Sequence, residues 1–173
     1  MKTTIHAIGI TLFLLFASLL QGEAAPNEAS ITRKSKCPVC GMFVFKYKPW
    51  WAQIRYANGQ DLTFDGVKDM MVYYLAGPGT NQNQSSPQNV KEIWIKDYYT
   101  LEWIEAERAY FVTGSDVFGP MGHEFIPFSS LAAAENFKQD HKGEAILRFD
   151  DIKAEQVEMM RRGAKMKNHI RTK

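Results

Sequence analysis

The sequence predicts an α+β fold with two homologous ββαβ halves and a C-terminal helical tail. Segments rich in aromatic and β-branched residues recur at strand length, and each half contains one stretch with helical periodicity. The two helical stretches, TFDGVKDMMVYYL and PFSSLAAAENFKQ, occupy equivalent places, with a phenylalanine just before each helix. This shared order indicates an internal duplication. We therefore expect a first half at 37–105, a second half at 106–153 and a tail at 154–173.

The first half opens with an aromatic-rich run, FVFKYKPWWAQIRY, that favours extended backbone from Met42 onwards. The NG at 58–59 predicts a tight turn, which the short strand DLTF follows. Asp65 stands where a helix cap would, ahead of GVKDMMVYYLAG, and Gly77-Pro78-Gly79 ends that helix. The polar stretch at 80–89 predicts a loop, and KEIWIKDYYTLEWIEA returns to extended structure.

The second half repeats this order. RAYFVTG predicts a strand, GSDVFGPMGHE a turn-rich loop and EFIPF a short strand. Ser129 or Ser130 can cap a helix in SLAAAENFKQDHKG, which Gly143 ends. EAILRFDDI is the last strand, and the tail is expected to be a helix that frays into a basic end.

Composition excludes several classes of protein. The chain has 173 residues, 45% hydrophobic and 13% aromatic, which is enough to bury a core and argues against overall disorder. Its formal charge of +2, from 21 basic and 19 acidic residues, provides no electrostatic reason to expect nucleic acid as a partner. We find no phosphate-binding loop, dinucleotide fingerprint or nucleophile with a partner histidine. The sequence thus predicts a binding protein and not an enzyme.

Residues 1–24 have the features of a secretory signal peptide. Lys2 precedes an apolar run at 5–20, and small residues follow in QGEAAPN, which favours cleavage after Ala24. The polar and basic residues 25–36 then predict a flexible lead-in. The apolar run is short for a membrane span, and no cysteine lies near the cleavage site to carry a lipid anchor. We expect an exported protein; an uncleaved signal that tethers it to the membrane is the alternative.

The motif CPVCGM contains the only two cysteines of the chain, Cys37 and Cys40, followed closely by Met42. A disulfide across so small a loop would remove little entropy from the unfolded chain, so a structural role is a weak explanation. Thiolate and thioether sulfurs are soft donors that together favour Cu(I) over hard cations. Gly41 permits unusual backbone angles that would help both sulfurs turn towards one ion.

A second candidate motif, GPMGHE, lies in the other half. Met121 stands between Pro120 and Gly122, whereas a methionine that fills a core normally belongs to an apolar periodic run. His123 adds a nitrogen donor two residues later. We therefore predict a metal site formed by Cys40, Met42 and Met121, which Cys37 or His123 completes. Cys37 could instead only modulate Cys40, and His123 could be a loop residue without a role.

The CxxC spacing has other interpretations. A periplasmic thiol-disulfide oxidoreductase using the Cys37/Cys40 pair is the main alternative, although such a pair usually follows a strand and begins a helix, whereas here it precedes a strand-like run. Redox exchange would need both cysteines and neither methionine. A structural zinc site usually needs four ligands, and the chain has no second CxxC or paired histidine.

The pieces CPVCGM, TFDGVKDMM, FVTGSDVFGPMGHEFIPF and LRFDDI, in this order, resemble the NosL family, whose members are accessory proteins of nitrous oxide reductase. The resemblance covers 37–152 and implies a periplasmic Cu(I)-binding chaperone that supplies copper to this enzyme of denitrification. We expect a monomer. Its implied partners are the reductase or its membrane assembly and copper-transport proteins. The fold it implies has two ββαβ halves, similar to those of organomercurial lyase. The family motif positions are Cys40, Met42 and Met121; the lipid-bearing cysteine common in the family is absent here.

Overall fold

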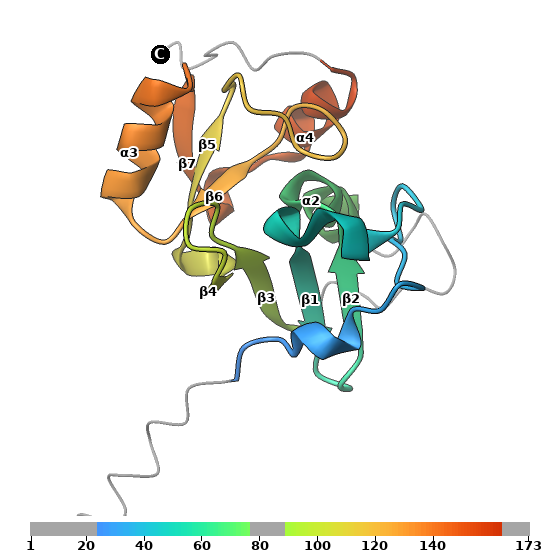
Figure 1. Ribbon diagram of the computed structural model, residues 1–173. Helices are drawn as coiled ribbons and strands as arrows, with labels where there is room; N and C mark the ends of the chain where they lie inside the picture. Colours follow the sequence, from blue (N-terminus) through green and yellow to red (C-terminus); the bar gives the residue numbers. More distant parts are fainter. Residues whose placement is uncertain (1–23, 77–88, 164–173) are drawn as a thin grey trace, which may run out of the picture.

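In the computed structural model, residues 24–76 and 89–163 are described, and they form two antiparallel sheets with helices packed against them (Figure 1). All of the predicted signal peptide except Ala24, and the end of the predicted tail, lie outside these residues. Within them, no helix has both the length and the apolar character needed to cross a membrane.

The elements alternate between strands and helices along the chain. The strands are β1 (Ala52–Tyr56), β2 (Asp61–Phe64), β3 (Val90–Lys96), β4 (Trp103–Glu105), β5 (Tyr110–Thr113), β6 (Ile126–Phe128) and β7 (Ala145–Arg148). The α-helices are α2 (Val67–Ala76), α3 (Leu131–Asp140) and α4 (Ala154–Arg161). Short 3-10 helices are η1 (Glu28–Ser30), η2 (Val44–Trp50), η4 (Ala106–Arg108) and η5 (Phe149–Asp151).

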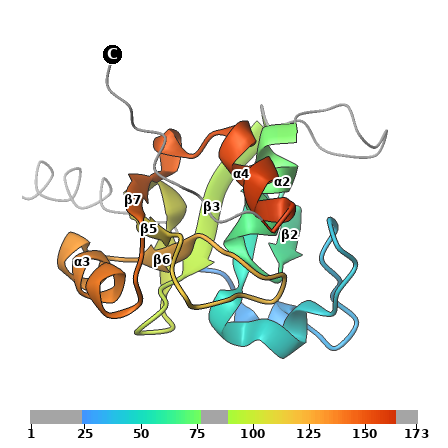
Figure 2. The ribbon, with the colours of Figure 1, turned by 90° about the horizontal axis from the view of Figure 1, so that it is seen from above.

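The two sheets share a common strand order. The first is β2-β1-β3-β4 and the second is β6-β5-β7, and all pairings are antiparallel. In the first sheet β1 lies between β2 and β3, and α2 connects β2 to β3 along the chain. In the second sheet β5 lies between β6 and β7, and α3 connects β6 to β7. The α4 helix lies beside α2, so the C-terminal segment returns to the first half (Figure 2).

Strand β5 connects two apolar cores because its side chains alternate between the faces of its sheet. Phe111 belongs to the large core formed with the first sheet, α2 and α4, whereas its neighbour Val112 belongs to a smaller core beneath α3. In the smaller core Phe137 of α3 packs against Phe128 of β6, with ring centroids 4.9 Å apart. The second sheet is therefore buried on both faces, and the large core joins the two halves.

The aromatic run after Met42 differs from the sequence prediction. Residues Val44–Trp50 form the 3-10 helix η2, with a non-helical residue at Tyr47, and β1 begins only at Ala52. Pro49 has no backbone N–H to donate to a neighbouring strand, which disfavours a sheet position here. The aromatic residues of this run favour burial, and burial does not by itself specify a strand.

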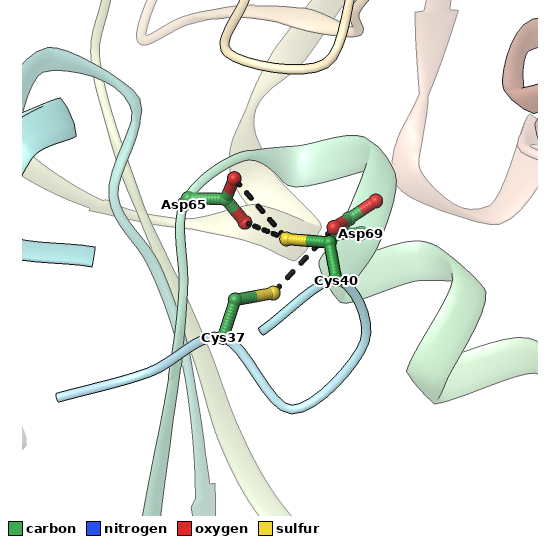
Figure 3. A group of neighbouring side chains, drawn as sticks. All are labelled: Cys37, Cys40, Asp65 and Asp69. Carbon is green, nitrogen blue, oxygen red and sulfur yellow. Dashed lines mark hydrogen bonds between the residues drawn. The ribbon is translucent and has the colours of Figure 1, made fainter. Parts of the chain in front are cut away.

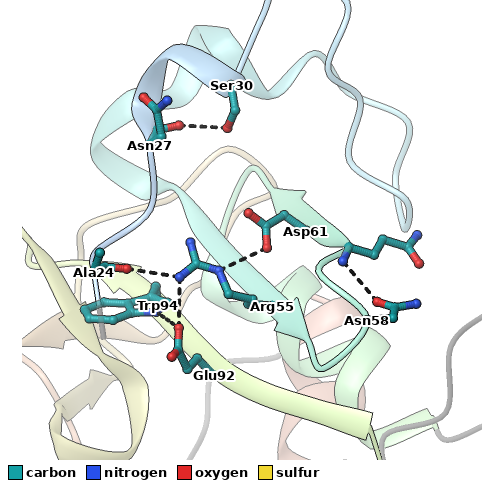
Figure 4. Close-up of polar contacts among 9 residues, drawn as sticks. Ala24, Asn27, Ser30, Arg55, Asn58, Asp61, Glu92 and Trp94 are labelled. Atoms are coloured by element: carbon teal, nitrogen blue, oxygen red, sulfur yellow. Dashed lines mark hydrogen bonds and ion pairs between the residues drawn. The ribbon is translucent and has the colours of Figure 1, made fainter. Parts of the chain in front are cut away.

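The segment that precedes η2 contacts the first sheet and the large core. Arg55 of β1 donates to the carbonyl oxygen of Ala24 at 3.0 Å and to the carboxylates of Asp61 and Glu92 at 3.2 and 3.0 Å (Figure 4). The side chain of Ile31 is buried in the large core. Ile31 lies within the predicted lead-in, 25–36, whereas Ala24 is the last residue of the predicted signal peptide; the flexibility expected of the lead-in stays a prediction.

The helix of the second half has the predicted N-cap. Ser130 accepts a hydrogen bond from the amide of Ala133 at 3.2 Å, as an N-cap serine does. The helix ends at Asp140, and Lys142 takes the left-handed conformation with φ 54°. The amide of Gly143 then donates to the carbonyl of Lys138 at 2.8 Å, which ends the helix close to the predicted stop.

Candidate metal centre

The CPVCGM segment, 37–42, folds into a tight turn. The amide of Cys37 donates to the carbonyl of Met42, and the amide of Gly41 donates to the carbonyl of Cys37, both at 2.9 Å. Gly41 has φ 77°, a conformation that a residue with a Cβ rarely adopts. The turn places both thiols beside α2; Cys37 is buried and Cys40 is half-buried.

Two carboxylates face these thiols: Asp65 lies just before α2, and Asp69 lies in its first turn (Figure 3). The thiol of Cys37 donates to Asp69 at 3.5 Å, and that of Cys40 donates to the two oxygens of Asp65 at 3.4 and 3.5 Å. Ligand atoms of all four residues lie within 4.8 Å of one another, so each thiol also lies close to the second carboxylate. We call these four residues the thiol–carboxylate cluster.

Burial and the carboxylates hold both thiols in the protonated form. Burial, together with the nearby Asp65, raises the pKa of Cys37 far above the ordinary thiol value. Burial, assisted by Asp69, raises the pKa of Cys40 to about 12. A thiolate, which a metal needs as a ligand, forms here only when an incoming cation displaces the proton.

The carboxylates were not predicted as site residues. Asp65 was expected to cap α2, but its carboxylate accepts from the Cys40 thiol. The signal that could have found them is their spacing, because residues four apart around the first turn of a helix lie on one face. Contact with the CPVCGM turn could not be deduced from that spacing alone.

The cap of α2 comes from the other half of the chain. Glu124 is buried, and its carboxylate accepts from the amides of Lys68 at 2.5 Å and Phe125 at 2.9 Å. A carboxyl oxygen at a helix N-terminus satisfies a backbone amide that has no partner within the helix. The Glu124 side chain can approach the start of α2 this closely because it packs between Gly66 and Gly119. A Cβ atom at either glycine would press against it.

Lys68 attaches the GPMGHE loop to the same helix. Its buried ammonium group donates to the carbonyl oxygens of Met121 at 2.6 Å and His123 at 2.9 Å. Lys68 is the residue before Asp69, so the loop and the thiol–carboxylate cluster both contact the first turn of α2. The two motifs that the sequence singled out are thus brought to one end of one helix.

The family model for NosL matches residues 28–157 of this sequence. That range includes both motifs and most of the described fold. The chain belongs to the NosL family.

Two solved structures of NosL proteins are similar to this chain. The crystal structure of the copper chaperone NosL from Shewanella denitrificans has 24% sequence identity and a TM-score of 0.61, and the alignment covers 79% of this chain and 98% of that one. The solution structure of the apo-NosL protein from Achromobacter cycloclastes has 30% identity and a TM-score of 0.45, covering 61% of this chain and 87% of that one. No curated protein sequence matches the chain.

The other predicted ligands of this NosL protein differ in their exposure to solvent. Met42 is half-buried and is the last residue of the CPVCGM turn. Met121 is exposed, at 47%, with its backbone fixed by Lys68. His123 is half-buried, and its ring packs against that of Phe118 with centroids 4.9 Å apart. The participation of these three residues in a metal site stays a prediction.

The buried Glu124 should make stability depend on pH. Burial raises its pKa to about 8 from 4.5, so between these values the folded protein keeps a proton that the unfolded chain has released. Stability is then greatest below the unfolded value and falls as pH rises through the window. We expect the wild type to lose about 2–4 kcal/mol more than Glu124→Gln between pH 5 and 8, at ~1.4 kcal/mol per pKa unit.

Glutamine keeps an oxygen acceptor for the two amides but cannot ionise, which makes it the matched comparison. Chemical denaturation at pH 5 and pH 8 measures the difference. Parallel pH profiles for the two proteins would contradict the assignment of this titration to Glu124.

Proposed function

We propose that this protein is a periplasmic copper chaperone that binds Cu(I) through sulfur ligands and transfers it to a copper enzyme. The observation that carries the proposal is the meeting of the CPVCGM turn and the GPMGHE loop at the first turn of α2. Family membership supports it, because the structural neighbour from Shewanella denitrificans is a copper chaperone. The protein then acts as a carrier and not as an enzyme.

The proposed Cu(I) ligands are Cys40, Met42 and Met121. Cys40 is the more accessible thiol, Met42 belongs to the same CPVCGM turn, and Met121 belongs to the loop whose backbone Lys68 of α2 binds. Thioethers cannot be oxidised to disulfides, and they keep a soft metal bound without any loss of a proton. Cys37 or His123 completes the coordination.

An exposed ligand supports the release of copper. Met121 reaches solvent, so a donor from a partner protein can enter as this thioether leaves. Copper would then pass by stepwise exchange of ligands, and no naked ion would be released. A set of four buried ligands would slow such an exchange.

The client we propose is nitrous oxide reductase, reached directly or through its membrane assembly and copper-transport proteins. An exported, monomeric protein with its signal peptide removed fits this role. We also propose that the two halves arose by duplication, which the shared strand order of the two sheets supports.

A thiol-disulfide oxidoreductase is the less favoured function. Catalytic redox cysteines have thiol pKa values below the ordinary range, because the thiolate is the attacking form. In this protein burial and two carboxylates raise the pKa of both thiols. The pair is therefore poorly suited to nucleophilic attack, whereas a metal ion can still displace the protons.

A copper transfer experiment tests the proposal. Protein loaded with one Cu(I) is mixed anaerobically with copper-depleted nitrous oxide reductase, and copper content and activity of the reductase are followed. We expect faster activation than with the same copper held by a small chelator, and no such gain with Cys40→Ser. Equal activation by the chelator alone, or copper retained by the protein, would contradict a chaperone function.

A further inference from the structure

The first residues of the predicted mature chain contact the first sheet. Pro26 and Ile31 are buried. Between them, the carboxylate of Glu28 forms an ion pair with the buried Lys96 of β3. Cleavage after position 24 leaves Ala25 as the one residue before Pro26, so the new α-amino group starts close to this sheet.

Arg55 of β1 links the predicted cleavage site to a glutamate of β3. Its Nη1 atom donates to the carbonyl oxygen of Ala24 and to Oε2 of Glu92, both at 3.0 Å (Figure 4). The two acceptors share one nitrogen, so they are no more than about 6 Å apart. The nitrogen of Ala25 is about 2.2 Å from the Ala24 oxygen, because both atoms belong to one peptide group. This nitrogen therefore lies within about 8 Å of Oε2 of Glu92.

Glu92 has one carboxylate oxygen without a donor. Its Oε2 accepts from the indole of Trp94 at 2.9 Å as well as from Arg55, whereas Oε1 is buried and has no hydrogen-bond partner within 24–76 and 89–163. The Glu92 side chain is 11% exposed. Arg55 also pairs with Asp61, so one guanidinium serves two carboxylates and one negative charge is left unbalanced in this group. One more cation would satisfy both the buried oxygen and the charge.

We propose that Glu92 is the binding site for the α-ammonium group that removal of the signal peptide creates at Ala25. A signal peptidase hydrolyses the peptide bond with one molecule of water: Ala24 leaves as a carboxylate, and Ala25 keeps the nitrogen, which is largely protonated at neutral pH. The ammonium group donates to Oε1 of Glu92, and the group of Arg55, Asp61 and Glu92 becomes neutral. The inference rests on the cleaved signal peptide of the proposed function and is independent of copper binding.

Cleavage then exchanges one contact of the first sheet for another. The carbonyl of Ala24, an acceptor for Arg55, departs with the signal peptide, and the ammonium of Ala25 provides a donor for Glu92. The uncleaved chain has a neutral amide at this position, so it keeps the first contact and cannot form the second. The first sheet therefore reaches its full stability only in the processed protein.

Acetylation of the α-amine tests the proposal. A chain that begins at Ala25 is compared with the same chain acetylated at its α-amino group, and mass spectrometry verifies the single modification. The acetyl carbonyl takes the place of the Ala24 carbonyl, so Arg55 regains its acceptor while the positive charge is lost. We expect acetylation to lower the Tm by about 2–5 °C. Without the proposed ion pair, the regained hydrogen bond would leave the Tm unchanged or raise it.

Substitutions identify the carboxylate. In Glu92→Gln, which keeps an oxygen acceptor but carries no charge, acetylation should change the Tm by less than about 1 °C. Glu102→Gln, at an exposed glutamate, is the matched control and should respond to acetylation like the wild type. Circular dichroism establishes that each variant is folded.

A second measurement needs no substitution. At pH 7 the α-amine of the Ala25 chain should react with an acylating reagent about tenfold more slowly than that of a chain beginning at Gly22, because an ion pair worth one pKa unit lowers the fraction of free amine tenfold. Equal rates would overturn the proposal.

The results separate this inference from the copper proposal. Mass spectrometry of the exported protein locates the cleavage site, and a first residue other than Ala25 would overturn the inference. An unchanged or higher Tm after acetylation, or an equal loss of Tm in Glu92→Gln, would do the same. The acetylated chain should bind Cu(I) within about threefold of the unmodified chain. If the α-amine behaves as expected and Cu(I) does not bind, only the copper proposal is wrong.

Discussion

Replacement of Cys40 by serine should lower the Cu(I) affinity about a thousandfold, or ~4 kcal/mol. The substitution exchanges a soft thiolate for a hydroxyl that binds Cu(I) poorly, and Cys40 is the accessible thiol of the cluster. Serine is of similar size and can still donate to Asp65, so the turn should keep its fold. A competition titration against a colorimetric Cu(I) chelator, under anaerobic and reducing conditions, measures the change.

Val39→Ala is the control for this substitution, since it alters the same turn without removing a donor atom. Its Cu(I) affinity should stay within about threefold of the wild type. An unchanged affinity in Cys40→Ser would show that copper binds elsewhere, and would remove Cys40 from the proposed copper site.

The Cu(I) affinity should rise steeply with pH, by about tenfold per pH unit for each thiol that loses its proton. Burial raises the pKa of Cys40 to about 12, so the thiol is protonated throughout the physiological range and copper must displace that proton. Affinity therefore falls as pH decreases and does not level off until pH approaches the thiol pKa. Titrations between pH 6 and pH 9, each corrected for the pH dependence of the competing chelator, measure the slope.

The slope also counts the thiolates. If Cys40 alone binds Cu(I) as a thiolate, log affinity rises by about one per pH unit, and Cys37→Ser has the same slope. A slope of about two in the wild type that falls to one in Cys37→Ser would make Cys37 a second thiolate ligand. A pH-independent affinity would mean that neither thiolate binds the copper.

The helices and the strands next to them could be predicted because their signals are local. Helical periodicity from Val67 and from Leu131 located α2 and α3, and the serine before α3 forms the expected cap. The prediction was wrong at Val44–Trp50, where aromatic residues are equally suited to a strand and to a 3-10 helix buried against the core. The aromatic composition of this segment indicates that it is buried. Its backbone conformation depends in addition on Pro49 and on contacts with the rest of the fold.

For the candidate site, the sequence predicted the residues that are unusual in type or setting, and it did not predict the carboxylates that contact them. The two cysteines and the isolated Met121 are uncommon in type and setting, and these residues or their backbone lie at the first turn of α2. Glu124 could not be identified as the cap of α2, because 56 positions separate it from Lys68 and no local pattern links them. Asp65 was predicted to cap the helix, which is a common role for aspartate at this position, and its contact with the Cys40 thiol was therefore not predicted.

The most direct test of a copper site shared by both halves is the Cu(I) affinity of Met121→Leu compared with Met159→Leu. Both methionines are exposed, at 47% and 41%, but Met159 belongs to α4 and to no predicted site. We expect Met121→Leu to weaken Cu(I) binding about ten- to a hundredfold, since a soft ligand is lost, and Met159→Leu to bind like the wild type. Equal, unchanged affinities in both variants would contradict a site that bridges the CPVCGM turn and the GPMGHE loop.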